Sequence, residues 1–194
     1  MVNSWSFVLR KRVLMQSDEQ RLIARILDGH AEDFGYFLER YGEEVFAIVS
    51  RLVPQQEDAE ELVQDAFVRA FNRLETFVGR SSFSTWVCRI AYTTAVSWLR
   101  KQRIKYLSID DNPHLTDTEV DEGLDDETRI DDLRRAITQL KPDEQTLLQL
   151  YYYDNRPLAD IAYILDVEAG TIATRLHRIR RKLYLLMNQM QRNR

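Results

Sequence analysis

The stretch that most constrains the fold lies near the C-terminus and reads PLADIAYILDVEAGTIATRLHRIRRKL over residues 157–183. Apolar residues recur in both of its halves with the spacing of a helix that buries one face. Residues 166–168 separate the halves and are expected to form a turn. The pattern predicts two short helices that cross closely around that turn. The apolar positions are Leu158, Ile161, Ala162, Leu165, Ile172, Leu176, Ile179 and Leu183.

The opposite face of the second predicted helix is polar and cationic, and no Asp or Glu follows Glu168. Such a face can meet phosphates and base edges. An arginine-rich helix alone is as often a solvated surface. The helix and turn that precede this one favour a DNA-binding helix-turn-helix. The residues on this face are Gly170, Thr174, His177, Arg178 and Arg181, with Arg175, Arg180 and Lys182 on its flanks.

The composition limits the class of protein. A chain of 194 residues with 44% hydrophobic content fits one or two domains. No apolar run approaches the about 18 residues of a membrane-spanning helix, so no membrane insertion is expected. The single cysteine, Cys88, excludes an internal disulfide framework, and the scattered histidines give no metal-ligand spacing. We therefore expect a reduced, cytoplasmic protein with no metal and no other cofactor.

Charge is strongly segregated along the chain, although the net charge is only −4. Residues 76–109 contain no Asp or Glu, whereas residues 108–127 are densely acidic and contain no Lys or Arg. The acidic segment is also poor in apolar residues, so it cannot bury enough area to offset the entropy of ordering. Residues 104–128 are therefore predicted to be a flexible linker between two domains.

The part before the linker is predicted to be a helical bundle. Ser17 and Gln20 form a capping-box signal for a first helix, which Gly29 ends. A long second helix closes at Pro54, and a third begins near Glu57. Residues 1–16 lack the order of a signal peptide and are predicted to be a loosely held extension, with Met15 as an alternative start.

Residues 76–86, TFVGRSSFSTW, form a hydroxyl-rich segment with aromatic residues beside an arginine. Such a loop can stack unpaired bases on aromatic rings and bind phosphates. Alternatively, Phe83 and Trp86 begin the buried stripe of the next helix. That fourth helix is predicted to run to about Arg103 and to present a second candidate DNA surface. Its outward residues are Arg89, Thr93, Val96, Arg100 and Arg103.

The fold is therefore predicted to be all-α, with two small helical domains on a flexible acidic linker and a helix-turn-helix in the second. No strand alternation, phosphate-cradling glycine-rich loop or nucleophile–base pair is present in the sequence. Neither an enzyme nor a small-molecule substrate is expected.

Two motif blocks, read together, resemble a known family. DAEELVQDAFVRAF (residues 58–71) followed by FVGRSSFSTWVCRIAYTTAVSWLRK (residues 77–101) is similar to region 2 of bacterial RNA polymerase sigma factors of the extracytoplasmic-function (ECF) class. Residues 140–183 resemble region 4 of the same class. The resemblance implies a region-2-like domain over residues 17–103 and a region-4-like domain over residues 129–194.

The resemblance also implies roles for individual residues. The third helix would dock on the clamp helices of the polymerase large subunit through Asp58, Glu61, Gln64 and Asp65. The segment before the fourth helix would capture a base flipped from the minus-ten element, and the fourth helix would hold the adjacent DNA. The implied minus-ten residues are Gly79, Arg80, Ser81, Ser82, Phe83, Trp86, Arg89, Thr93 and Arg100. The implied minus-thirty-five residues are Thr171, Thr174, Arg175, His177, Arg178 and Arg181.

The implied partners are core RNA polymerase, promoter DNA and an anti-sigma protein, which in this family is often membrane-anchored. Several positions depart from the family pattern. Thr93 stands where Asn is usual, Ser97 replaces a common Asp, and Ala173 stands where a basic residue is frequent. Asp166 replaces the usual turn glycine, which the left-handed conformation open to Asp permits. The promoter sequence therefore does not transfer from relatives.

Two other classes of function remain open from the sequence. One is a helix-turn-helix regulator that binds duplex DNA without core polymerase. The other is an enzyme of nucleic-acid metabolism, which the lack of a catalytic constellation disfavours. The acidic linker is open to two interpretations as well. It either follows the basic RNA-exit path of the polymerase as a nucleic-acid mimic or is only a solvated tether.

Overall fold

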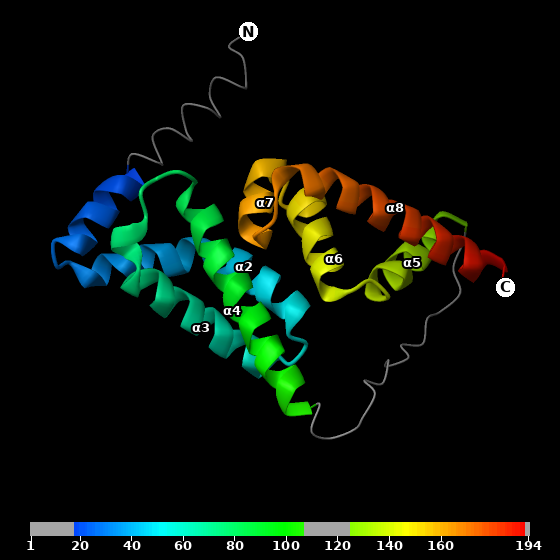
Figure 1. The fold of residues 1–194 in the computed structure, drawn as a ribbon, viewed down its shortest axis with the longest axis horizontal. Coiled ribbons are helices and arrows are strands. Elements are labelled where there is room, and N and C mark those ends of the chain that lie inside the picture. Colours follow the sequence, from blue (N-terminus) through cyan, green and yellow to red (C-terminus); the bar gives the residue numbers. More distant parts are fainter. Residues whose placement is uncertain (1–17, 107–124, 193–194) are drawn as a thin grey trace, which may run out of the picture. The chain divides into compact units, whose positions relative to one another are not determined.

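The computed structural model describes residues 18–106 and 125–192, and within these ranges every regular element is a helix (Figure 1). This confirms the prediction of an all-α protein. The chain divides into two compact units, Met1–Thr94 and Ala95–Arg194, so the division falls inside one continuous helix. The predicted extension over residues 1–16, Ser17 of the capping box and most of the predicted linker lie outside the described residues.

The first unit is a helical bundle built around two long helices, α2 (Gly35–Leu52) and α3 (Gln56–Asn72). It begins with a helix over residues 18–27, which ends at Gly29 with a φ of 107°. Helices α2 and α3 pack against each other, and the chain between them is extended at Val53, ahead of Pro54. The elements that follow the first helix are η1 (Ala31–Phe34), α2 (Gly35–Leu52), α3 (Gln56–Asn72), η2 (Leu74–Thr76) and α4 (Phe83–Tyr106).

Aromatic side chains form the centre of this unit, and Phe83 lies among them with 1% of its surface exposed. Its ring centroid is 4.0 Å from that of Phe37, 5.7 Å from that of Tyr41 and 5.6 Å from that of Trp86. The ring of Phe77 packs edge-on at 5.7 Å. Such pairs contribute about 0.5–1.5 kcal/mol beyond the area they bury. The cluster therefore fixes the start of α4 against α2.

Two buried polar contacts fasten the same region. The hydroxyl of Tyr41 donates a hydrogen bond to Glu19, whose side chain is almost fully buried on the first helix. Burial raises the pKa of the Tyr41 phenol far above its ordinary value, and the Glu19 carboxylate raises this pKa further. Ser84 Oγ donates to Glu44 Oε2 at 2.6 Å. The first helix and the first turn of α4 are thus both tied to α2.

The second unit contains the predicted helix-turn-helix. Its elements are α5 (Asp125–Thr138), α6 (Pro142–Leu148), the π-helical segment η3 (Gln149–Tyr153), α7 (Leu158–Leu165) and α8 (Ala169–Arg192). Pro142 occupies the first turn of α6, where its missing N–H costs nothing. Helix α8 contacts both α7 and α5.

The turn of the helix-turn-helix forms where it was predicted. Asp166 follows α7 in the left-handed conformation, with φ 56° and ψ 49°. Ile172, Leu176 and Ile179 are buried, which confirms the predicted stripe, while Leu183 is half-buried. Leu158 is 39% exposed, because it is the first residue of α7 and lies at the edge of the packed face.

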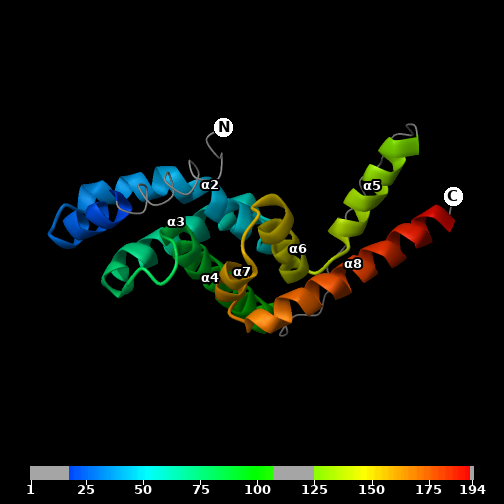
Figure 2. The same ribbon diagram turned by 90° about the horizontal axis from the view of Figure 1, so that it is seen from above.

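Three helix ends differ from the predicted ones. Helix α4 extends to Tyr106 and α5 begins at Asp125, so residues 104–106 and 125–128 of the predicted linker are helical. Acidic residues favour the positive end of a helix dipole, which explains why α5 can begin inside the acidic segment. Helix α8 is also longer than predicted and runs unbroken to Arg192 (Figure 2). Helix α5 packs against α8.

The contact between α8 and α6 predicts a pH effect on stability. Lys182 Nζ lies 2.7 Å from Glu144 Oε2, which also accepts a hydrogen bond from the Lys141 N–H at 2.9 Å. Burial acts to raise the pKa of the Glu144 carboxyl, but these two contacts outweigh it and hold the pKa below the ordinary 4.5. A lowered pKa in the folded state stabilises the fold above pH 4.5, and this stabilisation is lost as the pH falls through the lowered value.

We therefore expect the free energy of unfolding of the wild-type protein to fall more steeply below pH 4.5 than that of Glu144→Gln. Urea unfolding followed by circular dichroism between pH 3 and 6 measures the difference. Parallel curves for the two proteins would show that this ion pair contributes no pH dependence.

Candidate polymerase and nucleic-acid interfaces

Helix α3 presents one polar face to solvent. Its opposite side is buried through Ala59, Leu62, Ala66 and Ala70. Of the residues predicted to bind polymerase, Glu61, Gln64 and Asp65 are exposed and Asp58 is half-buried. Two apolar side chains continue the exposed surface toward the end of the helix, Val68 at 59% and Phe71 at 38% exposure. A surface with carboxylates at one end and apolar side chains at the other suits a protein partner.

The segment between η2 and α4 brings a glycine and an arginine to the surface. Gly79 has a φ of 72°, a conformation that glycine adopts without strain. Gly79 and Arg80 are exposed, and Ser81 is half-buried. Ser82 has a structural task, because its Oγ accepts the backbone N–H of Thr85 at 3.1 Å and caps α4. The Ser81 hydroxyl donates to the Ser82 carbonyl oxygen at 3.2 Å, so the groups that this segment offers to a nucleic acid are the exposed backbone at Gly79 and the exposed side chain of Arg80.

The two aromatic residues after this segment do not form part of an open surface. Phe83 is 1% exposed and Trp86 is 8% exposed, and both belong to the aromatic cluster. A base cannot stack on either ring unless the core opens. Both side chains therefore begin the buried stripe of α4, as the alternative interpretation expected, and this burial disfavours the prediction that they contact DNA.

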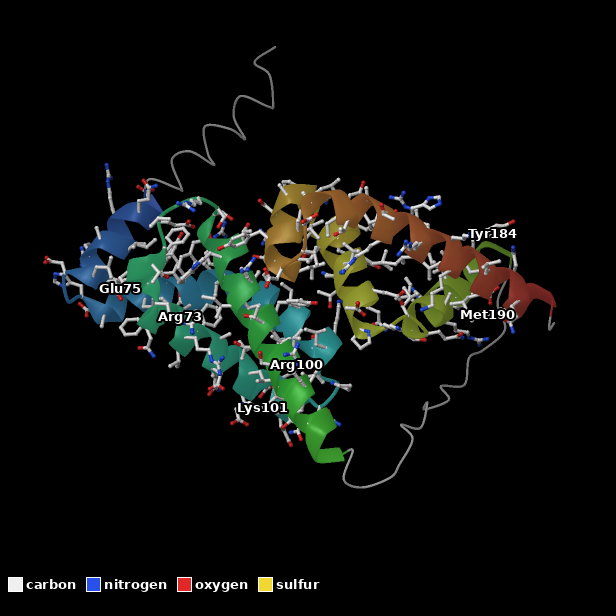
Figure 3. All side chains as sticks on the ribbon, in the orientation of Figure 1. Arg73, Glu75, Arg100, Lys101, Tyr184 and Met190 are labelled. Atoms are coloured by element: carbon white, nitrogen blue, oxygen red, sulfur yellow. The ribbon has the colours of Figure 1, made fainter. Side chains whose placement is uncertain are left out.

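The outward face of α4 carries the remaining predicted minus-ten residues. Arg89 is half-buried, and Thr93 and Arg100 are exposed. The Thr93 hydroxyl donates to the carbonyl oxygens of Arg89 at 2.9 Å and Ile90 at 3.0 Å, so it is already used within the helix. Arg100 and Lys101 project from the C-terminal half of α4 (Figure 3). The side chain of Arg103 lies outside the described residues.

The basic face of α8 is exposed as the sequence predicted. Thr174, Arg175, His177, Arg178 and Arg181 are all exposed, while the buried stripe lies on the other side of the helix. Thr171 is half-buried, and its hydroxyl donates to the carbonyl oxygen of Glu168 at 2.7 Å. In this structure the hydroxyl stabilises the first turn of α8, and a DNA contact of Thr171 stays a prediction. The arginines remain available to phosphates and base edges.

Sequence patterns missed one contact of this face. Arg180 Nε donates to the hydroxyl of Tyr152 at 2.7 Å. Two adjacent tyrosines of η3, Tyr151 and Tyr152, lie beside the Arg180 guanidinium. Helical spacing of 3.6 residues does not reveal a π-helical segment. The run YYY at residues 151–153 was the available signal.

The described residues offer no sign of a metal centre, since they contain no group of three or more His, Cys, Asp or Glu side chains that could hold an ion. A search of the same part of the chain for a helix long and apolar enough to cross a membrane finds none.

Two family comparisons match this arrangement. Residues 37–104 match sigma-70 region 2, and residues 130–183 match sigma-70 region 4. RNA polymerase sigma factor YlaC of Bacillus subtilis is 31% identical over 158 residues, which cover 79% of this chain and 91% of that protein. The ECF RNA polymerase sigma-E factor of Escherichia coli K12 is 31% identical over 176 residues, which cover 85% and 92%.

Solved structures show the same fold. The sigma factor RpoE of Bartonella quintana, in complex with the anti-sigma factor NepR, matches with a TM-score of 0.63 at 23% identity, over 81% of this chain and 98% of that one. CnrH, in complex with the cytosolic domain of CnrY, matches with a TM-score of 0.60 at 19% identity, over 87% and 96%.

Region 2 and region 4 occur here in one chain, in that order, and the helices that carry them have the expected faces exposed. The chain belongs to the ECF class of RNA polymerase sigma factors, which recognise promoters and initiate transcription. Sigma factors are initiation factors and not enzymes. A helix-turn-helix regulator that works without polymerase has no use for region 2, so that alternative is not favoured.

Proposed function

We propose that the chain acts as a promoter clamp with two contact points, one in each domain. The domain over residues 17–103 binds core RNA polymerase and the minus-ten element, and the domain over residues 129–194 binds the minus-thirty-five element. The observation that carries this proposal is the pair of separate cationic surfaces, on α4 and on α8, in a chain that also presents an acidic face on α3. The chain then owes its affinity for the promoter complex to three contacts, one with polymerase and one with each DNA element.

The acidic face of α3 is the proposed polymerase contact. Glu61, Gln64 and Asp65 project together, with Asp58 at the edge of the same surface. The exposed apolar side chains Val68 and Phe71 support the proposal, because aromatic and apolar groups next to charges form the core and rim of protein interfaces.

The exposed segment at residues 79–81 is the proposed site for an unstacked base of the minus-ten element. Arg80 supplies the charge for a phosphate, and Gly79 lets the backbone approach closely. Unstacking a base costs a few kcal/mol, which such contacts offset. Phe83 and Trp86 hold the segment in place from the core of the first unit. Arg89, Thr93 and Arg100 lie on the helix that follows and line the DNA-binding surface.

The exposed face of α8 is the proposed reader of the minus-thirty-five element. Thr174, His177 and Arg178 face the major groove, and Arg175 and Arg181 contact phosphates. Of the three residues that face the groove, only Arg178 has a guanidinium, which can make a bidentate contact to guanine. Promoter preference should therefore depend most on Arg178.

The proposal extends to location and regulation. The chain works in the cytoplasm, where polymerase acts, and leaves the chemistry of RNA synthesis to polymerase. It is held inactive by an anti-sigma protein that covers the surfaces just described. The structure of RpoE with the anti-sigma factor NepR supports this, since a related fold binds such a protein.

Charge reversal on α3 tests the polymerase contact. The double variant Glu61→Lys/Asp65→Lys should bind core polymerase roughly tenfold or more weakly, because it brings like charges together at the interface. Native gel titration of labelled chain with core polymerase measures the affinity.

Glu75→Lys is the matched control, since Glu75 is an exposed carboxylate on η2 and lies outside this face (Figure 3). It should bind as the wild type does. If the double variant is folded and still binds with wild-type affinity, α3 is not the contact.

A further inference from the structure

A cationic site on the flank of the basic face of α8, outside the implied minus-thirty-five residues, lies where η3 meets α8. Arg180 Nε donates a hydrogen bond of 2.7 Å to the Tyr152 hydroxyl. Its Cζ lies 5.8 Å from the ring centroid of Tyr152 and 5.9 Å from that of Tyr151. The two rings meet edge-on, with centroids 4.9 Å apart. The guanidinium is therefore held against two aromatic side chains although it lies on an exposed part of α8.

The π-helical segment η3 is what presents the two tyrosines. Leu150 is fully buried and anchors the segment. Gln149 Nε2 donates to Asp154 Oδ1 at 2.9 Å, and the Arg156 N–H donates to the Leu150 carbonyl oxygen at 2.9 Å. Asn155 between them has a φ of 49°. A π-helical turn is rare and often marks a functional site.

The arrangement orients the Arg180 charge and does not neutralise it. The bond to Tyr152 occupies Nε–H, and a guanidinium carries further N–H donors in a planar fork. Hydrogen bonding to Tyr152 holds the pKa of Arg180 above its usual range, with a smaller contribution from Tyr151. Among residues 18–106 and 125–192, no carboxylate pairs with Arg180; Lys182 on the other flank of α8 has such a partner in Glu144.

Arg180 also continues the DNA-facing surface of α8. Residues three apart on a helix are neighbours, so Arg180 lies next to His177. His177 borders the exposed face that carries Thr174 and Arg181. A side chain at the flank of a helix in the major groove is directed toward the sugar-phosphate backbone that borders the groove. Arg180 is therefore placed for a phosphate and not for a base edge.

We propose that Arg180, oriented by Tyr151 and Tyr152, binds a backbone phosphate of the duplex beside the minus-thirty-five element, with Tyr152 as its positioning residue. The planar fork of arginine matches two phosphate oxygens. This inference rests on the proposed function, in which α8 enters the major groove. The competing explanation is a brace, in which Arg180 only fastens η3 to α8.

The salt dependence of DNA binding separates the two explanations. The experiment uses holoenzyme assembled from the full chain and core polymerase of its host. The probe is a fluorescent promoter duplex that ends upstream of the minus-ten element, taken from a mapped transcript start. Arg180→Gln should lower the slope of log K against log salt by about 0.9, because one phosphate contact releases about that many counterions. A brace would change thermal stability and leave the slope unchanged.

Two conservative variants give an independent readout. Arg180→Lys keeps the charge and should keep the slope, but it should bind several-fold more weakly, because an ammonium lacks the fork. Tyr152→Phe keeps the ring and removes only the hydroxyl, and it should also weaken binding several-fold at an unchanged slope. If Arg180→Gln does not fold, wild-type affinity in both conservative variants overturns the inference.

Arg134→Gln is the matched control in the same unit. It removes one arginine charge from α5, where Arg134 pairs with Asp131 at 3.0 Å, and it should leave the slope unchanged. If folded Arg180→Gln keeps the wild-type slope while Arg178→Ala still loses promoter preference, the phosphate site at Arg180 is overturned. The proposed function is then left intact. Failure of the unaltered holoenzyme to prefer the promoter duplex over a scrambled duplex contradicts the proposed function instead.

Discussion

Replacing Phe83 by alanine is expected to destabilise the first unit by about 3–5 kcal/mol, the usual cost of truncating a buried phenylalanine. Phe83 is 1% exposed and contacts aromatic rings on α2, on α4 and in the segment before α4. Small domains are stable by only about 5–15 kcal/mol, so much of the first unit should unfold at moderate urea concentrations. Urea titration followed by tryptophan fluorescence measures the loss.

Val78→Ala is the control for this variant. Val78 lies in the same segment but is 71% exposed, so its truncation should change stability by about 0.5 kcal/mol at most. The functional consequence also differs from that of a base-stacking residue. Phe83→Ala should lose polymerase binding and promoter melting together, whereas Arg80→Ala should lose melting alone. A stable Phe83→Ala protein that binds polymerase but cannot melt DNA would contradict the assignment of Phe83 to the core.

Replacing Arg178 by alanine is expected to weaken promoter selection while leaving polymerase binding intact. A bidentate arginine–guanine contact contributes about 1–3 kcal/mol of discrimination, which corresponds to a loss of roughly fivefold to 150-fold in preference for the cognate element. Arg178 is exposed and lies opposite the buried stripe of α8, so its removal leaves the packing of the helix-turn-helix unchanged. Competitive run-off transcription on cognate and mutated templates measures the preference.

Arg178→Lys sharpens this result. Lysine retains the charge but not the fork, so overall affinity should be largely kept while discrimination falls. Equal loss of polymerase binding and promoter selection in Arg178→Ala would show that α8 presents a different reading face.

The helix-turn-helix could be predicted from the sequence because its determinants are local. The spacing of Ile172, Leu176 and Ile179 fixes the buried side of α8, and the exposed basic side follows from geometry. Asp166 could likewise be predicted as the turn, since a short polar side chain tolerates the left-handed conformation that it adopts.

The role of Phe83 could not be decided in the same way. An aromatic residue just before a helical pattern fits an exposed loop and a buried stripe equally well. What decides is packing against Phe37 and Tyr41, which lie far earlier in the sequence. The buried contact of Glu19 with Tyr41 is similarly invisible to periodicity.

The site at Arg180 was missed for a different reason. A π-helical segment changes the direction of the side chains that follow it, and regular helical spacing does not reveal such a segment. Only the structure shows that Tyr151 and Tyr152 face Arg180. Sequence patterns therefore placed Arg180 on the flank of the basic face of α8 but did not reveal its two aromatic partners.

Run-off transcription with core polymerase tests the central claim most directly. Start sites mapped after overexpression of the chain supply the templates, and reactions with core polymerase alone supply the baseline. We expect initiation at the mapped starts only when the chain is present, and we expect the transcripts to be lost when either promoter element is mutated. Tight binding of the chain alone to these duplexes, with no initiation when polymerase is added, would contradict it.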